Sequence, residues 1–581
     1  EKIFGPTHLN VALCLNNLAA LYKARGDDQQ AEPLYQRALT IREKTFGPNH
    51  TEVAQSLNNL ARLYQDRGDY QQAKPLYQRV LTIYEKSLGP EHPNTAVCLH
   101  NLATLYAADG QLAQAIHYRV RCNDTSERDL MHNLITGSEN QKALYLKKTV
   151  GYTDQTISLH LQSAPQSIEA QRAALAVVLR RKGRALDAMT MAIETLRQQQ
   201  SPEVQKLMDD YATLTGQISV LTLRGPGKKK PEEHLANLNE LEAQKEKLEN
   251  DISRRSGEFQ VQTQPITLEN IQKAIPSNAV LVEFAIYKPY DSKKDTFETP
   301  RFVAYVLNPQ GVIRFVDLGD VEPIDQVVST LRKTLSNPKA NLEREVKPAA
   351  QVLDKLVMKP VRGLVGNANH LLISPDGPLN LIPFSALVDE KGNFLVENYT
   401  LTYLTSGRDL LRLAVKIDSR QPPLVMADPN YLDGDGPRML GHTPGRLVRL
   451  AGTRVEGEQL KVIFPDAVLK VRTEATEHDL KQVNRPAPVH IATHGYFLED
   501  ALQTAEKIAV DQSAQRILPS DLERERDANP LLRSMLFFAG ANQGGTADND
   551  GVMTALEAAQ LNLWGTKLVT LSACDTGLGD V

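Results

Sequence analysis

The amino-acid sequence predicts an array of α-helical repeats, then a helical spacer, then an α/β domain whose mixed, mostly parallel sheet is covered by helices. Two observations carry this prediction. One helix-forming pattern recurs near the N-terminus with a period of 42 residues, and after about residue 265 the apolar pattern changes to short runs typical of strands. The length of 581 residues also exceeds what one hydrophobic core supports, so we expect three or four domains.

The composition excludes several classes of protein. With 41% hydrophobic and 23% charged residues, the chain is typical of soluble globular proteins, and no apolar run approaches the roughly 20 residues that span a bilayer. The formal net charge of −4 does not favour direct binding of nucleic acid. Four cysteines do not form a disulfide framework, so we expect a reducing, cytoplasmic location.

Both ends of the sequence lie close to recognisable features. The chain begins at Glu1 with a repeat already in progress at Phe4, and it stops at Val581 shortly after Cys574. We therefore interpret it as a fragment truncated at both ends, in which the absence of a signal peptide is uninformative.

The repeats lie within residues 1–125. Their cores are LNNLAALY (15–22), LNNLARLY (57–64) and LHNLATLY (99–106), and each is followed by a glycine turn and a second amphipathic helix. Such a helix–turn–helix unit buries its apolar face only by stacking on its neighbours. The pattern resembles tetratricopeptide repeats (TPRs) of the kinesin-light-chain-like type. That resemblance implies a concave surface for a protein or peptide partner, with a scaffold or oligomerisation role as the alternative.

Three histidines recur in phase with the repeats, namely His8, His50 and His92. They could be metal ligands, but one per repeat at a loop-to-helix junction favours a capping or turn contact. Cys14 and Cys98 occupy equivalent positions where the middle repeat has serine, which indicates a small packing site.

Residues 126–262 continue with apolar residues at helical spacing and predict a helical spacer. The segment RGPGKKKPEEH (224–234) interrupts it with prolines and glycines, so we expect a long helical hairpin around it. Its lysine run, Lys228–Lys230, predicts a solvated loop tip, and an anion-binding contact is the alternative.

Residues 263–581 predict the α/β domain. Helices are expected at 268–275 and within 323–365. Strands are expected at 279–287, 301–308, 312–319, 370–377, 401–406, 423–428, 489–495 and 566–577. Unbroken apolar strands alternating with helices are typical of a sheet covered on both faces.

Two reactive side chains follow strands of this domain. His494 closes the strand VHIAT and Cys574 closes the strand KLVTLSA. In such sheets chemistry is concentrated at the carboxyl ends of strands. An imidazole that handles protons beside a thiolate that attacks a carbonyl is the arrangement of a cysteine peptidase, and the N–H of Gly495 could stabilise an oxyanion. The alternatives are an inert buried thiol and a structural histidine.

Three longer strings sharpen this interpretation: SPDGPLNLIPFSAL (374–387), VHIATHGYF (489–497) and GVMTALEAAQLNLWGTKLVTLSACDTGLG (551–579). Together with the upstream repeats they resemble the CHAT family, a caspase-like family often fused to TPRs in bacterial-type proteins. The resemblance implies that His494 is the catalytic histidine and Cys574 the nucleophile. It also implies an oxyanion hole made by the backbone N–H groups of Gly495 and Cys574, with no metal and no cofactor.

The sequence departs from the caspase pattern in two respects. Ser572-Ala573-Cys574-Asp575-Thr576 replaces Gln-Ala-Cys-x-Gly, and the histidine precedes the cysteine by 80 rather than about 50 residues. We therefore do not assume cleavage after aspartate. The polar stretch 499–530 between them is either a substrate or activation loop or an ordinary surface insertion. His490 lies on the same side of its strand as His494, but no third metal ligand is evident.

We hypothesise a caspase-like cysteine endopeptidase whose TPRs recruit a protein substrate or an activator. The alternative is a non-catalytic TPR–CHAT scaffold for protein–protein interaction. A nucleotide-binding α/β domain is not favoured, because the sequence lacks a Gly-x-Gly-x-x-Gly or Walker-type loop.

Overall fold

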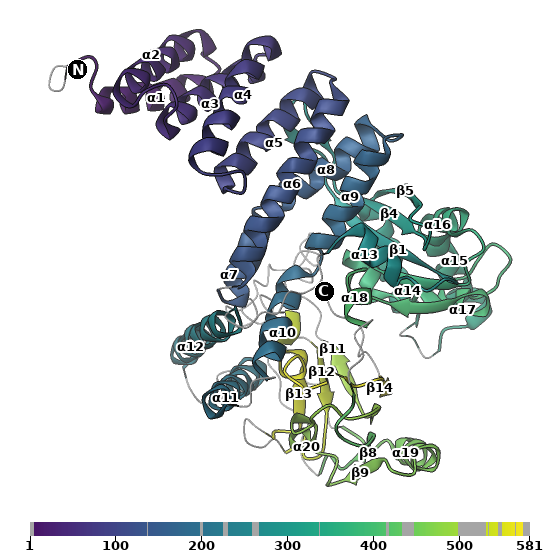
Figure 1. Ribbon diagram of the computed structural model, residues 1–581. Coiled ribbons are helices and arrows are strands. Elements are labelled where there is room, and N and C mark those ends of the chain that lie inside the picture. Colours follow the sequence, from purple (N-terminus) through teal and green to yellow (C-terminus); the bar gives the residue numbers. More distant parts are fainter. Residues whose placement is uncertain are drawn as a thin grey trace, which may run out of the picture.

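The structure is a computed structural model of the chain (Figure 1). It describes residues 5–135, 137–197, 201–224, 230–257, 266–335, 337, 339–413, 418–432, 447–497, 530–532, 534–543, 549–563 and 565–572. None of the helices in these ranges is both long and apolar enough to cross a membrane.

The repeats form three stacked helix pairs. Their helices are α1 (Leu9–Ala24), α2 (Asp28–Phe46), α3 (Thr51–Asp66), α4 (Tyr70–Ser87), α5 (Pro93–Ala108) and α6 (Leu112–Ile135). Apolar side chains from all three pairs share one continuous core. Ala19, Leu60 and Leu102 contribute to it from the first helix of each pair. The core spans the pairs because each pair covers the apolar face of the next.

The phased histidines are helix caps, as the sequence predicts. Nδ1 of His8, His50 and His92 accepts a hydrogen bond from the backbone N–H two residues later, at 3.1, 3.2 and 3.1 Å. Each ring thus satisfies one of the N–H groups that a helix start leaves without an intrahelical acceptor. Cys98 is buried in the shared core, as expected for a packing position. The same expectation is wrong for Cys14, which is exposed in the first repeat.

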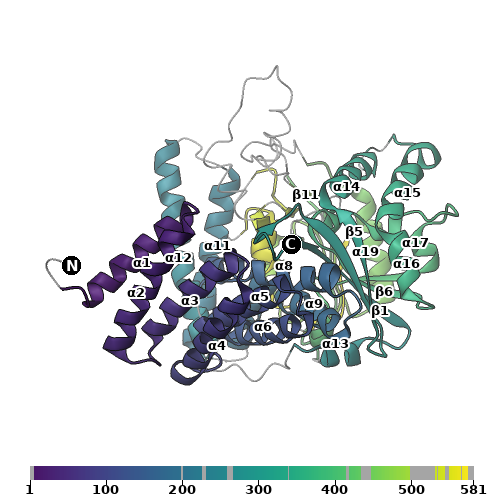
Figure 2. The same ribbon diagram turned by 90° about the horizontal axis from the view of Figure 1, so that it is seen from above.

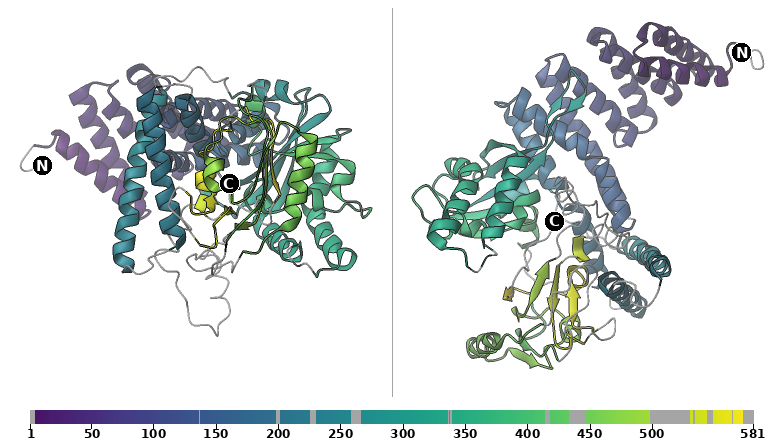
Figure 3. Two further views of the ribbon diagram at one scale, coloured as in Figure 1. Left: turned by 90° about the horizontal axis from the view of Figure 1, so that it is seen from below. Right: turned by 180° about the vertical axis from the view of Figure 1, so that it is seen from behind.

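The spacer consists of α7 (Glu139–Lys147), α8 (Val150–Ser158), the π-helical turn η1 (Leu159–Ser163), α9 (Ile168–Arg181), α10 (Arg184–Arg197), α11 (Pro202–Arg224) and α12 (Pro231–Gly257). Helices α11 and α12 form the expected long hairpin, packed through Leu214, Ile218 and Leu238 (Figures 1 and 3). Of the lysine run at its tip, only Lys230 lies within the described residues.

A five-stranded sheet follows, in the order β5-β4-β1-β6-β7. Its strands are β1 (Ala279–Tyr287), β4 (Arg301–Leu307), β5 (Ile313–Asp320), β6 (His370–Ser374) and β7 (Thr400–Tyr403), with a small hairpin of β2 (Tyr290–Asp291) and β3 (Thr296–Phe297) beside it. The β5–β4–β1 pairs are antiparallel and the β1–β6–β7 pairs are parallel.

Helices cover both faces of this sheet (Figure 2). One face packs on α14 (Val321–Leu335), α15 (Lys347–Leu356) and α16 (Met358–Val365), and the other packs on α8, α9 and α13 (Leu268–Ala274). Alternate residues of β1 serve the two cores, which explains its unbroken apolar run. Shorter elements complete the unit: η2 (Leu342–Val346), η3 (Gly377–Leu381), η4 (Phe384–Ala386), α17 (Leu395–Asn398) and α18 (Asp409–Leu413).

The remaining strands form two further sheets. A parallel sheet has the order β14-β10-β8-β9, with β8 (Leu424–Pro429), β9 (Val468–Arg472), β10 (Val489–Ala492) and β14 (Val569–Ser572). An antiparallel sheet contains β11 (Gly495–Phe497), β12 (Ser534–Phe537) and β13 (Val552–Thr554). Around them lie α19 (Ala451–Ile463), α20 (Glu477–Lys481), η5 (Pro530–Leu532) and α23 (Ala555–Ala558). The predicted fold class is confirmed, although its strands are divided between separate sheets.

A buried polar network joins the spacer to the five-stranded sheet. The Lys182 ammonium, just after α9, lies 3.0 Å from the Glu283 carboxylate and donates to Ser374 Oγ at 2.6 Å. Glu283 is fully buried and also accepts from the N–H of Gly407 at 2.8 Å. Because the carboxylate has several donors, its charge is compensated inside the core.

We expect that Lys182→Met lowers the thermal unfolding temperature of the protein by about 6–12 °C. The reason is that removing one partner strands a buried charge at a cost of about 3–5 kcal/mol. Scanning calorimetry measures the change, and Lys206→Met, at an exposed position of α11, is the control. A Lys182→Met/Glu283→Met double variant should recover part of the loss. A Lys182→Met variant no less stable than the control would contradict this account.

Candidate functional site

The candidate site lies at the carboxyl edge of the parallel sheet, where His494 follows β10. Strand β10 is flanked by β8 and β14 in parallel, with Ala492 paired with Ser572. The N–H of Thr493 continues this ladder by donating to the carbonyl of Ser572 at 3.2 Å. Cys574 lies outside the described residues, two positions beyond Ser572.

The imidazole of His494 is oriented by a backbone carbonyl. Its Nε2 lies 2.8 Å from the carbonyl oxygen of Val448. A carbonyl only accepts hydrogen bonds, so Nε2 carries the hydrogen, and in the neutral ring Nδ1 is the free base. Tyr431 lies beside the imidazole, with the two ring centroids 5.4 Å apart. The Tyr431 hydroxyl accepts a hydrogen bond from the backbone N–H of His494 at 3.3 Å. The arrangement leaves Nδ1 as the atom that can exchange a proton.

The Val448 carbonyl is itself held from both sides. On one side, Leu447 exchanges two hydrogen bonds of 3.0 Å with the side-chain amide of Asn542. On the other, the Arg449 guanidinium makes a bidentate pair with Asp428, both bonds 2.7 Å long. These contacts clamp the main chain around Val448, so we name Asp428, Arg449 and Asn542 the Val448 clamp. The clamp fixes where the imidazole can sit.

Asp428 anchors this clamp at the end of β8. Its carboxylate is fully buried, its N–H donates to Thr453 Oγ1 at 2.9 Å, and its φ of 47° is in the left-handed region. The hydrogen bonds to Asp428 raise the pKa of Arg449. Arg472, at the end of β9, lies 3.8 Å from the same carboxylate and also has a positive φ of 59°. Backbone strain of this kind is concentrated at functional sites.

Gly495, the proposed oxyanion residue, begins β11. It is buried and paired with Leu536 of β12. The N–H of Phe537 donates to the carbonyl of His494 at 3.0 Å, which identifies Gly495 and Leu536 as a non-hydrogen-bonded antiparallel pair. The N–H of Gly495 therefore faces away from β12, on the side of the strand that the ladder does not use.

His490, on the same strand as His494, contacts a carboxylate. Its Nε2 lies 2.9 Å from a carboxylate oxygen of Glu456 of α19. Glu456 also accepts from Ser572 Oγ at 3.2 Å and thereby bridges β10 and β14. Within the described ranges, no group of three His, Cys, Asp or Glu side chains is placed to hold a metal ion.

Helix α19 can lie close to the sheet because of one glycine. A Cβ at Gly457 would sit 3.0 Å from Cβ of Ala427 and 3.1 Å from Cδ1 of Leu469. A larger residue would push the helix, with Glu456, away from the strands.

Comparisons with known proteins agree with this architecture. A CHAT domain model matches residues 347–581, and a tetratricopeptide repeat model matches 1–44, 11–86 and 52–119. The chain carries tetratricopeptide repeats and a CHAT domain. None of the curated proteins compared with it matches.

Three solved structures to which this TPR–CHAT chain is similar are each less than a quarter identical to it over the matched segments. BtubC (BKLC) from P. vanneervenii is 21% identical with a TM-score of 0.22; the match covers 28% of this chain and 62% of BtubC. TPR-like repeats of a kinesin light chain from Podosopora anserina are 20% identical with a TM-score of 0.20, over 41% of this chain and 97% of theirs. Aspartyl phosphate phosphatase F from Bacillus subtilis is 15% identical with a TM-score of 0.20, over 44% and 63%.

The structure adds residues that the sequence interpretation missed. Asp428, Arg449 and Asn542 belong to no motif that we recognised, and only the position of Asp428 at a strand end was a signal. Of the polar stretch 499–530, all but Pro530 lies outside the described residues.

We expect that Asp428→Asn speeds amide hydrogen exchange in residues 447–450 by about tenfold or more. A hydrogen bond to a charged group contributes about 1.5–3 kcal/mol, and 1.4 kcal/mol corresponds to a factor of ten. Hydrogen–deuterium exchange with mass spectrometry measures the rate. Arg454→Gln, which removes the exposed Arg454–Glu458 pair of α19, is the matched control. Equal exchange in both variants would mean that Asp428 does not hold this segment.

Proposed function

We propose that the TPR–CHAT chain is a cysteine endopeptidase with His494 and Cys574 as its dyad. The observation that carries the proposal is the register of β10 and β14. Ala492 is paired with Ser572, and His494 and Cys574 each follow two residues later. Neighbouring strands lie about 4.8 Å apart, so a chain that continued in this register past Ser572 would bring the Cys574 thiol within reach of the His494 imidazole. The CHAT domain match, which spans both residues, supports the same assignment.

The proposed mechanism uses Nδ1 of His494 as the proton carrier. Nδ1 accepts the thiol proton, and the Cys574 thiolate attacks the peptide carbonyl. The N–H groups of Gly495 and Cys574 stabilise the oxyanion. His494 then gives the proton to the leaving amine, and a water molecule, deprotonated by Nδ1, hydrolyses the thioester. The Val448 carbonyl keeps the ring in the tautomer that these steps require.

The repeats mediate protein–protein contacts, and we assign recruitment of the substrate or activator to their concave side. Asparagine amides connect the inner helices: Asn59 donates to Asn16 at 2.8 Å, and Asn101 donates to Asn58 at 2.9 Å. Such amides can bind an extended peptide backbone because they both donate and accept. The repeats also contact the sheet unit, where Arg62 of α3 pairs with Asp295 beside β3 at 3.0 Å. A partner on the repeats could therefore influence the rest of the chain.

The first test is to compare new protein N-termini formed in a cell extract by the protein and by its Cys574→Ala and His494→Ala variants. We expect both variants to lose cleavage by at least about 10³-fold, because nucleophile and base act as a unit. Cys98→Ser, which copies the natural Ser56 of the middle repeat, should cleave normally. Termini that persist with Cys574→Ala would refute the peptidase. A chain that binds partners through the repeats but forms no termini would favour the scaffold.

A second expectation concerns recruitment. Asn59→Ala/Asn101→Ala should raise KM for a protein substrate by about five- to tenfold, because an interface residue that matters contributes more than about 1 kcal/mol. Cleavage of a short peptide substrate should be unchanged. Gln72→Ala, at an exposed position of the outer helix α4, is the control. Equal losses on the protein and the peptide would place the effect outside the repeats.

A further inference from the structure

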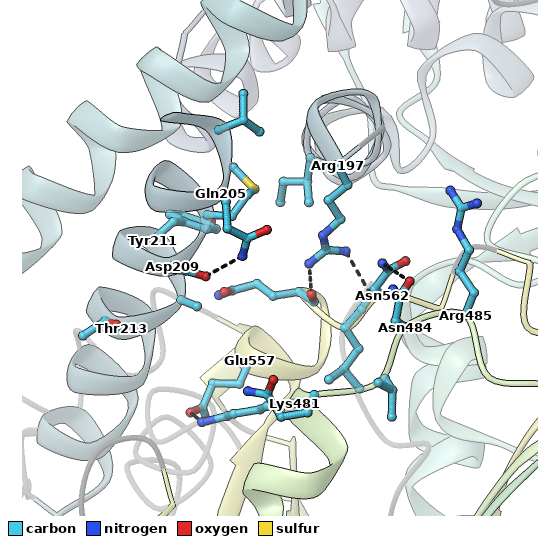
Figure 4. A pocket seen from close by; sticks show the side chains of 18 of the residues that line it. Arg197, Gln205, Asp209, Tyr211, Thr213, Lys481, Asn484, Arg485, Glu557 and Asn562 are labelled. Atoms are coloured by element: carbon cyan, nitrogen blue, oxygen red, sulfur yellow. Dashed lines mark hydrogen bonds and ion pairs between the residues drawn. The ribbon is translucent and has the colours of Figure 1, made fainter. Parts of the chain in front are cut away.

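A large cavity lies between the spacer and the CHAT domain, on the side of the parallel sheet away from His494. Its volume is about 810 Å³, which is the size of pockets that hold a small-molecule ligand. One wall is formed by α10 and α11, including Gln205, Asp209 and Tyr211. The other is formed by Arg420, the segment 481–485 and the segment 560–562. Figure 4 shows Lys481, Asn484, Arg485 and Asn562 of this second wall.

The second wall consists of the segments that lead into strands of the parallel sheet. Arg420 precedes β8, Arg485 precedes β10 and Asn562 precedes β14. Arg485 connects them: its carbonyl accepts from the N–H of Arg420 at 2.7 Å, and its N–H donates to the carbonyl of Asn562 at 2.8 Å. Arg485 makes these bonds with a φ of 53°, a conformation that costs a non-glycine residue free energy. The chain is thus held in a strained form where it lines the cavity.

The charges in the cavity wall are not balanced. Lys481 is neutralised by Glu477 and Glu557, at 2.5 and 3.0 Å. Arg485 has a buried Nε without a hydrogen-bond acceptor among the described residues, and neither Arg420 nor Arg485 has a carboxylate partner there. A buried guanidinium donor without an acceptor is costly, and a guanidinium group matches the geometry of phosphate oxygens.

We propose that this cavity binds a phosphorylated small molecule of about nucleotide size. Arg420 and Arg485 contact its phosphate, and the side-chain amide of Gln482 lies in the same wall for the polar remainder of the ligand. Gln205 and Asn484 also line the cavity, but Gln205 already donates to Asp209 at 2.8 Å and Asn484 already accepts from Asn562 at 3.0 Å. The ligand then lies between the spacer and the entries of β10 and β14. Its binding does not depend on the chain being a peptidase, so the two proposals fail separately.

The test is isothermal titration calorimetry of the whole protein with AMP, ATP, inorganic phosphate and acetate, at constant ionic strength in chloride buffer. We expect AMP or ATP to bind with a dissociation constant below about 1 mM. Arg485→Gln should weaken this binding at least tenfold, and Arg344→Gln, at an exposed position of η2, should leave it unchanged. Arg420→Gln, at an exposed position, is the second variant in case Arg485→Gln does not fold.

Three outcomes would overturn the proposal. The first is that no phosphorylated probe binds. The second is that AMP or ATP binds the arginine variants as tightly as the original protein. The third is that acetate binds as well as the phosphorylated probes, since this would indicate a general anion effect rather than recognition of phosphate.

Discussion

The parallel pairing of β10 with both of its neighbours is the constraint on which the candidate site depends. Val489 and Ile491 pack into one core with Phe538 and Met553, while His490 faces Glu456 on the opposite side. A slip of one residue would exchange these two faces and turn the polar side chain of His490 into an apolar core. The core therefore fixes the register, and the register fixes which residues emerge at the carboxyl edge. The position of His494 is a consequence of apolar packing several residues earlier in the strand.

At that edge, polar interactions take over from apolar packing. The Val448 carbonyl points at His494 because both neighbouring residues are held by hydrogen bonds. Leu447 bonds the side-chain amide of Asn542, and Arg449 bonds the buried carboxylate of Asp428. Asp428 and Arg472 keep left-handed backbone conformations there, which persist only where surrounding contacts over-determine them. Among the described residues, the side-chain contact that orients the His494 imidazole is the one to the Val448 carbonyl, and this strained, charge-paired edge holds that carbonyl in place.

Local signals account for what could be predicted from sequence. The histidine caps and the apolar run of β1 each express chemistry within a few neighbouring residues. Strand β9 was missed because its side chains are only partly buried and include Lys470, so the run lacks an apolar pattern. The division of the strands between sheets and the pairing of Asp428 with Arg449 depend on contacts between distant segments. Amphipathic spacing likewise predicts that α9 buries a face, but not that this face covers β1.

Within the described residues, the helices of the spacer contact both parts of the α/β region, the five-stranded sheet and the parallel sheet with its neighbours, through buried or partly buried polar bonds. Lys182 binds Glu283 of the five-stranded sheet, whereas Ser219 of α11 bonds Thr554 at 3.0 Å and Arg197 donates to the carbonyl of Leu561 at 3.2 Å. A rearrangement of α9–α11 would therefore alter both halves together. A partner on the repeats can shift such an equilibrium only by as much as its affinity differs between the two arrangements. Regulation through the spacer thus requires contacts that one arrangement makes and the other lacks, and the cavity beside α10 and α11 is where such contacts would change.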